Sequence, residues 1–133
     1  MSTAPKPTDA ELAILRVLWE HGASTVREVH DRMSSASRTV AYTTTLKTLQ
    51  VMTEKGLTLR ETIRGQHLYR ARHAEEETQR RLLTDLLDRA FGGSTSKLVV
   101  QALASRRASP EELREIRRVL APKPGDKKGS DHD

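Results

Sequence analysis

Hydrophobic residues near the start of the chain recur every three or four positions in two stretches, which is the spacing of amphipathic helices. Thr8, followed by Glu11, gives the capping-box pattern that opens the first stretch, and Gly22 closes it. Ser24 or Thr25 is expected to cap the second stretch. The predicted buried residues are Leu12, Leu15, Leu18 and Trp19 in the first helix, and Val26, Val29 and Met33 in the second.

A third helix is predicted for residues 40–55, and its two faces differ. Ser37 or Thr39 is expected to cap its start, and Gly56 suits the left-handed residue that ends many helices. At about 100° per residue, one face carries Tyr42, Thr45, Leu46, Leu49 and Met52, which we assign to the core. The opposite face is mostly small and polar, and it carries Thr43, Thr44, Lys47, Gln50, Val51 and Glu54.

A β-hairpin is predicted directly after this helix. Leu57, Leu59, Glu61 and Ile63 alternate with polar residues, which indicates a strand whose apolar side is interrupted by the glutamate. Residues 64–66 (Arg-Gly-Gln) supply the turn, and residues 67–71 (HLYRA) return as the second strand. Four arginines lie on or near the hairpin: Arg60, Arg64, Arg70 and Arg72.

Three short helices followed by a hairpin give the order of a winged helix-turn-helix. The polar face of the third helix can meet base edges and phosphates in a major groove, and a basic hairpin can hold phosphates or reach a minor groove. Tyr42 is expected either to support the helix against the core or to touch a phosphate. The predicted DNA-binding residues are Arg38, Tyr42, Thr43, Thr44, Lys47, Arg64 and His67.

Each of these features also has a simpler interpretation. The polar face of an amphipathic helix is commonly just its solvated side, and exposed arginines on a hairpin can serve only to discourage aggregation. Helix-turn-helix units also act as protein-interaction modules. The alternative function is therefore a winged-helix adaptor that does not bind DNA.

From residue 74 onward the pattern predicts three further helices. Three glutamates open the first of them, Gly92 and Gly93 end it, Ser94 or Thr95 caps the next, and Ser109-Pro110 begins the last. A unit of about 45 residues cannot bury this much apolar surface alone, so we expect an obligate homodimer. The alternative is one larger core shared with the winged helix. The predicted dimerisation residues are Leu82, Leu83, Leu86, Leu87, Phe91, Leu98, Val99, Leu103, Leu113, Ile116 and Leu120, with Val119 also facing inward.

Composition narrows the function further. Residues 1–73 hold 11 of the 23 basic residues but only 7 of the 18 acidic ones, which suits a polyanion-binding domain. Four aromatic residues are too few for a single-strand binder, so duplex DNA is the expected partner. Cysteine is absent, and the five histidines lie on different predicted elements. We expect no enzyme, no metal and no cofactor, and without an apolar run that could span a bilayer we expect a soluble cytoplasmic protein.

The expected fold class is mainly α with one small β-hairpin. It comprises a disordered arm (residues 1–7), a winged-helix DNA-binding domain (8–73), a helical dimerisation domain (74–121) and a disordered tail (122–133).

The segments DAELAILRVLWEHG, TVREVHDRM and AYTTTLKTLQVMTEKG, with a hairpin ending HLYRA, resemble the penicillinase-repressor family, which includes the β-lactamase and methicillin-resistance repressors. The resemblance covers residues 8–120. It implies a cytoplasmic dimeric repressor that binds an inverted-repeat operator by its winged helix. A copper-sensing branch uses paired cysteines, which this chain lacks, and the family's Gly-Arg wing tip is replaced here by Arg64-Gly65-Gln66.

The resemblance also implies that repression ends when a membrane-bound sensor with a zinc-protease domain triggers cleavage in the dimerisation helices. In the best-known members of the family that this chain resembles, the cut falls between an asparagine and a phenylalanine. The matching position here is Gln101-Ala102, so this chain departs from the family in the residues at its expected cleavage site.

Overall fold

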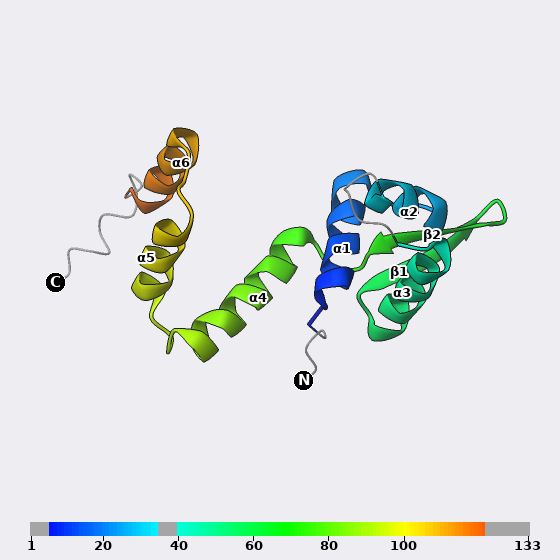
Figure 1. Ribbon diagram of the computed structural model, residues 1–133, viewed down its shortest axis with the longest axis horizontal. Helices are drawn as coiled ribbons and strands as arrows, with labels where there is room; N and C mark the ends of the chain where they lie inside the picture. Colours follow the sequence, from blue (N-terminus) through cyan, green and yellow to red (C-terminus); the bar gives the residue numbers. More distant parts are fainter. Residues whose placement is uncertain (1–5, 35–39, 122–133) are drawn as a thin grey trace. The chain divides into compact units, whose positions relative to one another are not determined.

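The computed structural model describes residues 6–34 and 40–121, and these form six helices and one hairpin (Figure 1). Grouping by contacts divides the chain into two compact units, the first ending at Asp85 and the second beginning at Leu86, so the division falls within α4. The elements are α1 (Asp9–His21), α2 (Val26–Ser34), α3 (Tyr42–Lys55), β1 (Thr58–Ile63), β2 (Gln66–Ala71), α4 (Glu75–Ala90), α5 (Thr95–Ser105) and α6 (Pro110–Leu120). The predicted fold class is confirmed, whereas the predicted arm and tail lie wholly or largely outside the described residues.

Local capping patterns set the starts of the first two helices. Thr8 and Glu11 form the predicted capping box of α1, because each side chain accepts a hydrogen bond from the backbone N–H of the other residue. Thr25 and Glu28 make the same reciprocal pair before α2. Of the two caps predicted for α2, Thr25 is therefore correct.

The helices α1, α2 and α3 and the base of the hairpin enclose one hydrophobic core. The predicted inward residues of α2 are all buried, whereas Leu12 and Trp19 of α1 are only half-buried and Ile14 is buried in their place. The indole Nε1 of Trp19 instead donates to the backbone oxygen of His73 at 2.9 Å. The core consists of Ile14, Leu15, Leu18, Val26, Val29, Met33, Leu49, Met52, Leu57 and Tyr69.

The third helix starts two residues later than predicted. Its N-cap position is held by Ala41, which makes no side-chain capping bond, and the expected caps Ser37 and Thr39 lie outside the described residues. The predicted end is confirmed, because Gly56 adopts the left-handed conformation with φ +86° and ψ 17°.

The hairpin has a tighter turn than predicted. Arg64 and Gly65 form it alone, both with positive φ (+52° and +78°), and Gln66 is already paired with Ile63 in the antiparallel ladder. Positive φ at both central residues is the pattern of a type I′ turn, which matches the twist of the strands it joins. At the other end of β2, Tyr69 forms two backbone hydrogen bonds with Ser24, at 2.8 and 2.9 Å.

The predicted alternation along β1 is wrong beyond its first residues. Leu57 is buried as expected, but so is its neighbour Thr58, whose hydroxyl lies 2.8 Å from that of Thr53 on α3. Farther along, Glu61 and Ile63 are both exposed. Because burial ends after Leu59, the outer half of the strand has no core to face.

The helices of the second half begin at the predicted residues. Ser94 caps α5, and Ser109 forms a capping box with Glu112 before α6, with Pro110 in the first turn. All residues of α4, α5 and α6 are described, and not one of them is buried. Val119 and Leu120, predicted to face inward, are 76% and 75% exposed within the single chain. Among the described residues, no helix combines the length and apolar character needed to cross a bilayer.

Candidate nucleic-acid interface

The predicted polar face of α3 is open to solvent. Thr43, Thr44 and Lys47 are all exposed, while Thr45, Leu49 and Met52 on the opposite face are buried. The buried face packs α3 against the hydrophobic core. The exposed face carries hydroxyls and an ammonium group, which can donate to base edges and phosphates. DNA binding by these residues stays a prediction.

Tyr42 differs from the prediction that placed it on the core face. It is 37% exposed, and its ring contacts two residues of α2. The guanidinium carbon of Arg27 lies 4.6 Å from the ring centre, and the His30 ring meets it edge-on at 5.6 Å and 74°. Sequence periodicity gave no signal for Arg27, because it describes one helix at a time and this contact joins two.

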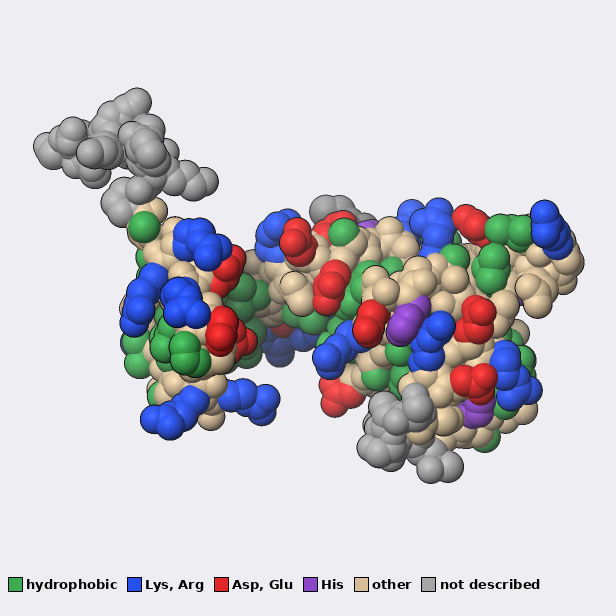
Figure 2. Space-filling view, turned by 90° about the horizontal axis from the view of Figure 1, so that it is seen from above, with side chains coloured by type: hydrophobic (Ala, Val, Ile, Leu, Met, Phe, Trp, Pro, Cys, Tyr) green, Lys and Arg blue, Asp and Glu red, His purple; other side chains and the backbone are tan. Residues whose placement is uncertain are grey.

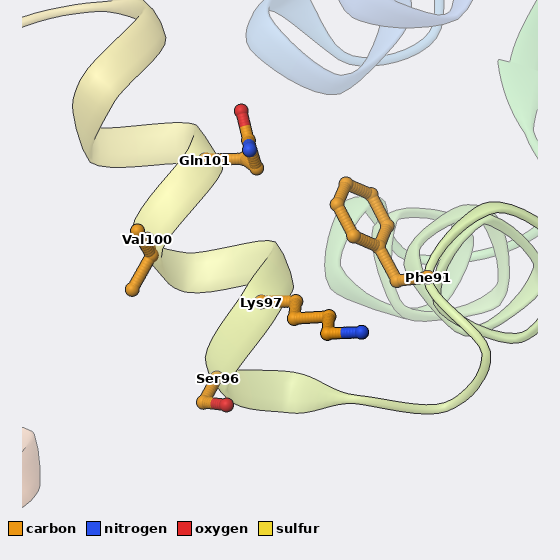
Figure 3. Close-up of a pocket in the computed structure, with 5 residues that line it drawn as sticks. All are labelled: Phe91, Ser96, Lys97, Val100 and Gln101. Carbon is orange, nitrogen blue, oxygen red and sulfur yellow. The ribbon is translucent and has the colours of Figure 1, made fainter.

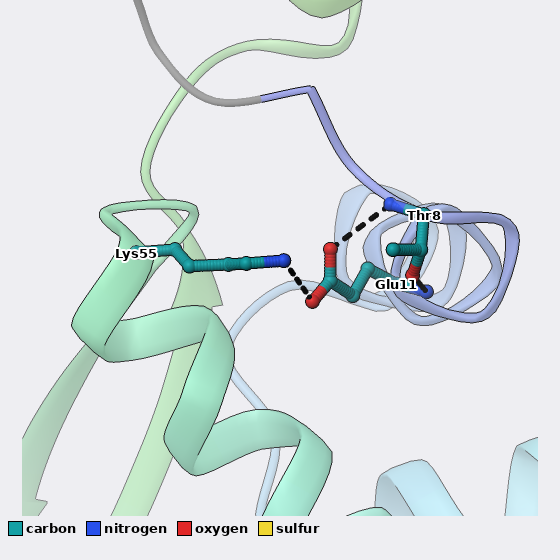
Figure 4. A network of polar contacts seen from close by, with 3 residues as sticks. All are labelled: Thr8, Glu11 and Lys55. Carbon is teal, nitrogen blue, oxygen red and sulfur yellow. Dashed lines mark hydrogen bonds and ion pairs between the residues drawn. The ribbon is translucent and has the colours of Figure 1, made fainter.

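An ion pair fixes the far end of α3 (Figure 4). The Nζ atom of Lys55 donates to Oε2 of Glu11 at 2.7 Å, and the backbone N–H of Thr8 donates to Oε1 of the same carboxylate at 2.9 Å. Burial raises the pKa of Glu11, but the hydrogen bonds from Lys55 and Thr8 and the charge of Lys55 outweigh it, leaving the pKa below its ordinary value of 4.5. The carboxylate therefore stays ionised and holds α3 against the start of α1.

The joint between α3 and the hairpin is also closed by hydrogen bonds. The hydroxyl of Thr53 donates to the backbone oxygen of Leu49 at 2.9 Å and lies 2.8 Å from the hydroxyl of the buried Thr58. The backbone N–H of Leu57 donates to the oxygen of Met52 at 2.8 Å. The hairpin thus leaves the end of α3 in a fixed direction.

The outer half of the hairpin carries the remaining described candidates. Arg64 is exposed at the tip, and His67 is exposed with its Nδ1 atom 3.0 Å from the hydroxyl of Thr62. Arg70 is held by Glu61, with Nε and Oε2 3.1 Å apart. Figure 2 shows a basic side chain (blue) at this tip next to hydrophobic ones (green).

The structure therefore brings most of the predicted DNA-binding residues into one compact unit. Tyr42, Thr43, Thr44 and Lys47 share α3, and Arg64 and His67 share the hairpin that follows it. Arg38 lies outside the described residues. This arrangement can present donors to a groove from the helix and to the sugar-phosphate backbone from the hairpin.

The predicted cleavage residues lie within α5. Gln101 and Ala102 are both exposed, and the backbone oxygen of Gln101 accepts a hydrogen bond from Ser105 at 2.7 Å. Gln101 also lines a hollow of about 360 Å³ with Phe91, Ser96, Lys97 and Val100. Figure 3 shows that the side chains of Lys97 and Gln101 leave α5 on the side of Phe91, and that the amide of Gln101 turns away from the Phe91 ring.

Comparisons with known proteins show which family this chain belongs to. The sequence profile of the penicillinase repressor family matches residues 7–122. Two proteins named Transcriptional regulator BlaI, from Mycobacterium tuberculosis strains CDC 1551 and H37Rv, are each 34% identical to this chain over 115 residues, which cover 85% of the chain and 81% of the relative. The chain therefore belongs to the penicillinase repressor family, whose members are transcriptional regulators and not enzymes.

Proposed function

We propose that this chain is a transcriptional repressor that binds an inverted repeat in duplex DNA as a homodimer. The observation that carries the proposal is the exposed face of α3, with Thr43, Thr44 and Lys47, on the same unit as a hairpin with Arg64 at its tip. A recognition helix and a wing of this kind contact a major groove and the adjoining backbone together.

In this proposal the candidate side chains contact different parts of the DNA. The hydroxyls of Thr43 and Thr44 meet base edges, because they can both donate and accept hydrogen bonds. Lys47 reaches a base edge or a nearby phosphate, while Arg64 and His67 contact the backbone from the wing. Arg70 is already paired with Glu61, so it contributes less to phosphate binding than Arg64.

A second copy of the chain covers the apolar side chains of α4, α5 and α6. Leu86, Val100 and Leu103 are 49%, 63% and 39% exposed, although such residues are usually buried. Figure 2 shows hydrophobic side chains open at the surface of the part that holds α5 and α6. Val100 is not among the predicted dimerisation residues, and all of those are either exposed or half-buried, so contact between two copies would complete their burial.

The dimer makes operator binding strong. Two linked recognition helices bind two half-sites, and the second binding event is then intramolecular. Losing the dimer would weaken repression without altering any contact to DNA.

We propose that cleavage at Gln101-Ala102 releases repression by this route, after a signal from a membrane-bound sensor protease. Both residues are exposed, and a cut there separates the two halves of α5 and so removes part of the dimer surface. Repressor that stays intact in induced cells containing the matching sensor would contradict this step.

The experiment that tests the main proposal is selection of bound sequences from a random duplex DNA library, followed by a salt titration of the winning site. Enrichment of an inverted repeat, bound tightly and with a steep salt slope, is the expected result. The oligomeric state is measured on the same sample by sedimentation. A folded dimer that binds DNA only weakly and without sequence preference would overturn the repressor proposal and favour the protein-interaction adaptor.

A further inference from the structure

Arg27 of α2 is not among the residues that the sequence assigned to DNA binding, yet it lies against one of them. Its guanidinium carbon is 4.6 Å from the centre of the Tyr42 ring, and both side chains are exposed. We propose that Arg27 is a further phosphate-binding residue and that Tyr42 positions it. This inference rests on the proposed function and deepens it by naming a contact that α2 makes with the DNA backbone.

The Tyr42 ring is braced by α2 as well as by its own helix. His30 meets the ring edge-on at 5.6 Å, and its Nδ1 atom lies 3.4 Å from the hydroxyl of Thr45. Thr45 is only 3% exposed, so His30 is anchored to the buried side of α3. The ring therefore has a defined place between the two helices, with a face available to Arg27.

The contact with Tyr42 orients the guanidinium without using up its hydrogen-bond donors. A cation above an aromatic face is attracted to the ring electrons, and the five N–H groups of arginine remain free to donate in their own plane. Within residues 6–34 and 40–121, no carboxylate forms an ion pair with Arg27. A phosphate, which accepts from arginine with two oxygens at once, is the ligand that fits this group.

The position of Arg27 in the fold matches the path expected for the DNA backbone. When a helix-turn-helix docks, the start of the second helix meets base edges while the first helix crosses the backbone. Here α2 and α3 take those two places. Arg27 is in the first turn of α2 and lies on Tyr42, the first residue of α3. Its charge thus lies beside the end of α3 that would enter the groove.

The test measures operator affinity of the full-length protein against salt concentration for wild type, Arg27→Gln and the control Arg16→Gln. Arg16 is also an exposed helical arginine, but it lies on α1. Arg27→Gln is expected to release about one ion fewer per half-site, or about two per operator, so that its operator affinity falls roughly 12-fold less than that of wild type between about 50 and 200 mM salt. Arg16→Gln is expected to keep the wild-type slope.

The positioning role of Tyr42 is tested in the same assay by a double-mutant cycle. Tyr42→Leu removes the ring and is expected to weaken binding more than Tyr42→Phe, which keeps it. In the Arg27→Gln background the difference in operator affinity between the two Tyr42 variants is expected to vanish, because the guanidinium that the ring positions is gone.

Two results would overturn the inference while leaving the repressor proposal intact. One is an unchanged salt slope for Arg27→Gln, even if its melting temperature and affinity fell, since that would show a purely structural role. The other is a difference in operator affinity between Tyr42→Leu and Tyr42→Phe that is equally large in the wild-type and Arg27→Gln backgrounds. Failure of the proposed function is distinguishable from both, because the wild type would then show no sequence-specific binding to any selected site.

Discussion

Lys55 in the last turn of α3 donates a 2.7 Å hydrogen bond to Glu11 in the first turn of α1. The Glu11 side chain is only 6% exposed and that of Lys55 is 34% exposed, so the carboxylate of the pair is shielded from solvent. It fixes the end of the proposed recognition helix to a part of the chain far from it in sequence.

Replacing Glu11 with glutamine is expected to lower the free energy of unfolding by about 1–3 kcal/mol, because the buried charge-assisted bond to Lys55 is lost. Urea unfolding at a fixed protein concentration measures the change. The control is Glu115→Gln, which breaks an exposed pair with Arg118 and is expected to cost under about 0.5 kcal/mol. Equal losses in the two variants would show that the burial of Glu11 has no energetic consequence.

The same pair is expected to make stability depend on pH. The pKa of Glu11 in the folded chain lies below its ordinary value of 4.5. Its stabilising contribution is therefore fully present above that ordinary value and is lost as the pH falls through the folded-state pKa. The difference in unfolding free energy between wild type and Glu11→Gln should shrink below pH 4.5, and a difference that stayed constant down to pH 3 would contradict the assignment.

Lys47→Ala and Arg64→Ala are each expected to weaken operator binding and to reduce the salt dependence by about one ion per half-site, because each removes one phosphate or base contact. Fluorescence anisotropy over a range of salt concentrations gives the slope. Arg16→Ala, on α1, serves as the control. If neither variant changed the slope, these two side chains would not be part of the interface.

Arg64→Asn is expected to separate stability from binding. Arg64 has a positive φ of +52°, which asparagine tolerates better, and Asn-Gly is a preferred pair for this turn. The free energy of unfolding should therefore stay the same or rise by up to about 1 kcal/mol, with an equal or higher melting temperature. The variant should nevertheless bind DNA less tightly. Calorimetry and DNA titration check the two parts, and unchanged DNA affinity would remove Arg64 from the interface.

Leu86→Asn is expected to dissociate the dimer, because it places an amide in the proposed contact between two copies. Asp88→Asn on the same helix introduces the same side chain at an exposed polar position and is expected to leave the dimer intact. Analytical ultracentrifugation at several concentrations distinguishes them. Leu86→Asn should also lose operator affinity by more than about tenfold through lost avidity, and a stable dimer in this variant would place the contact elsewhere.

Features that depend on neighbouring residues could be predicted from the sequence. Thr8 and Glu11, and likewise Ser109 and Pro110, identify helix starts because a cap needs only side chains and backbone groups within one turn. Gly56 marks a helix end for the same local reason. The sorting of Thr45, Leu49 and Met52 to the buried face of α3 follows from helical geometry alone.

Features that depend on distant residues could not be predicted in this way. Tyr42 shares the spacing of the buried residues, but what lies over its ring is Arg27 and His30 rather than the apolar core. The alternation along β1 predicted buried positions to Ile63, which is 47% exposed because the strand extends past the helices. For the candidate site this means that the helix face was predictable and the residue beside it on α2 was not.

The two hydrogen bonds between Ser24 and Tyr69 anchor the inner end of the hairpin, whereas all four residues from Ile63 to Gln66 at its outer end are exposed. Sequence changes at the tip therefore disturb no core packing, while changes at the base would expose Tyr69. During divergence of the family, this hairpin can accept new residues or a longer loop at its tip without loss of the fold. In the proposed binding mode, operator preference can thus evolve at the wing while the helices and core that carry the wing stay the same.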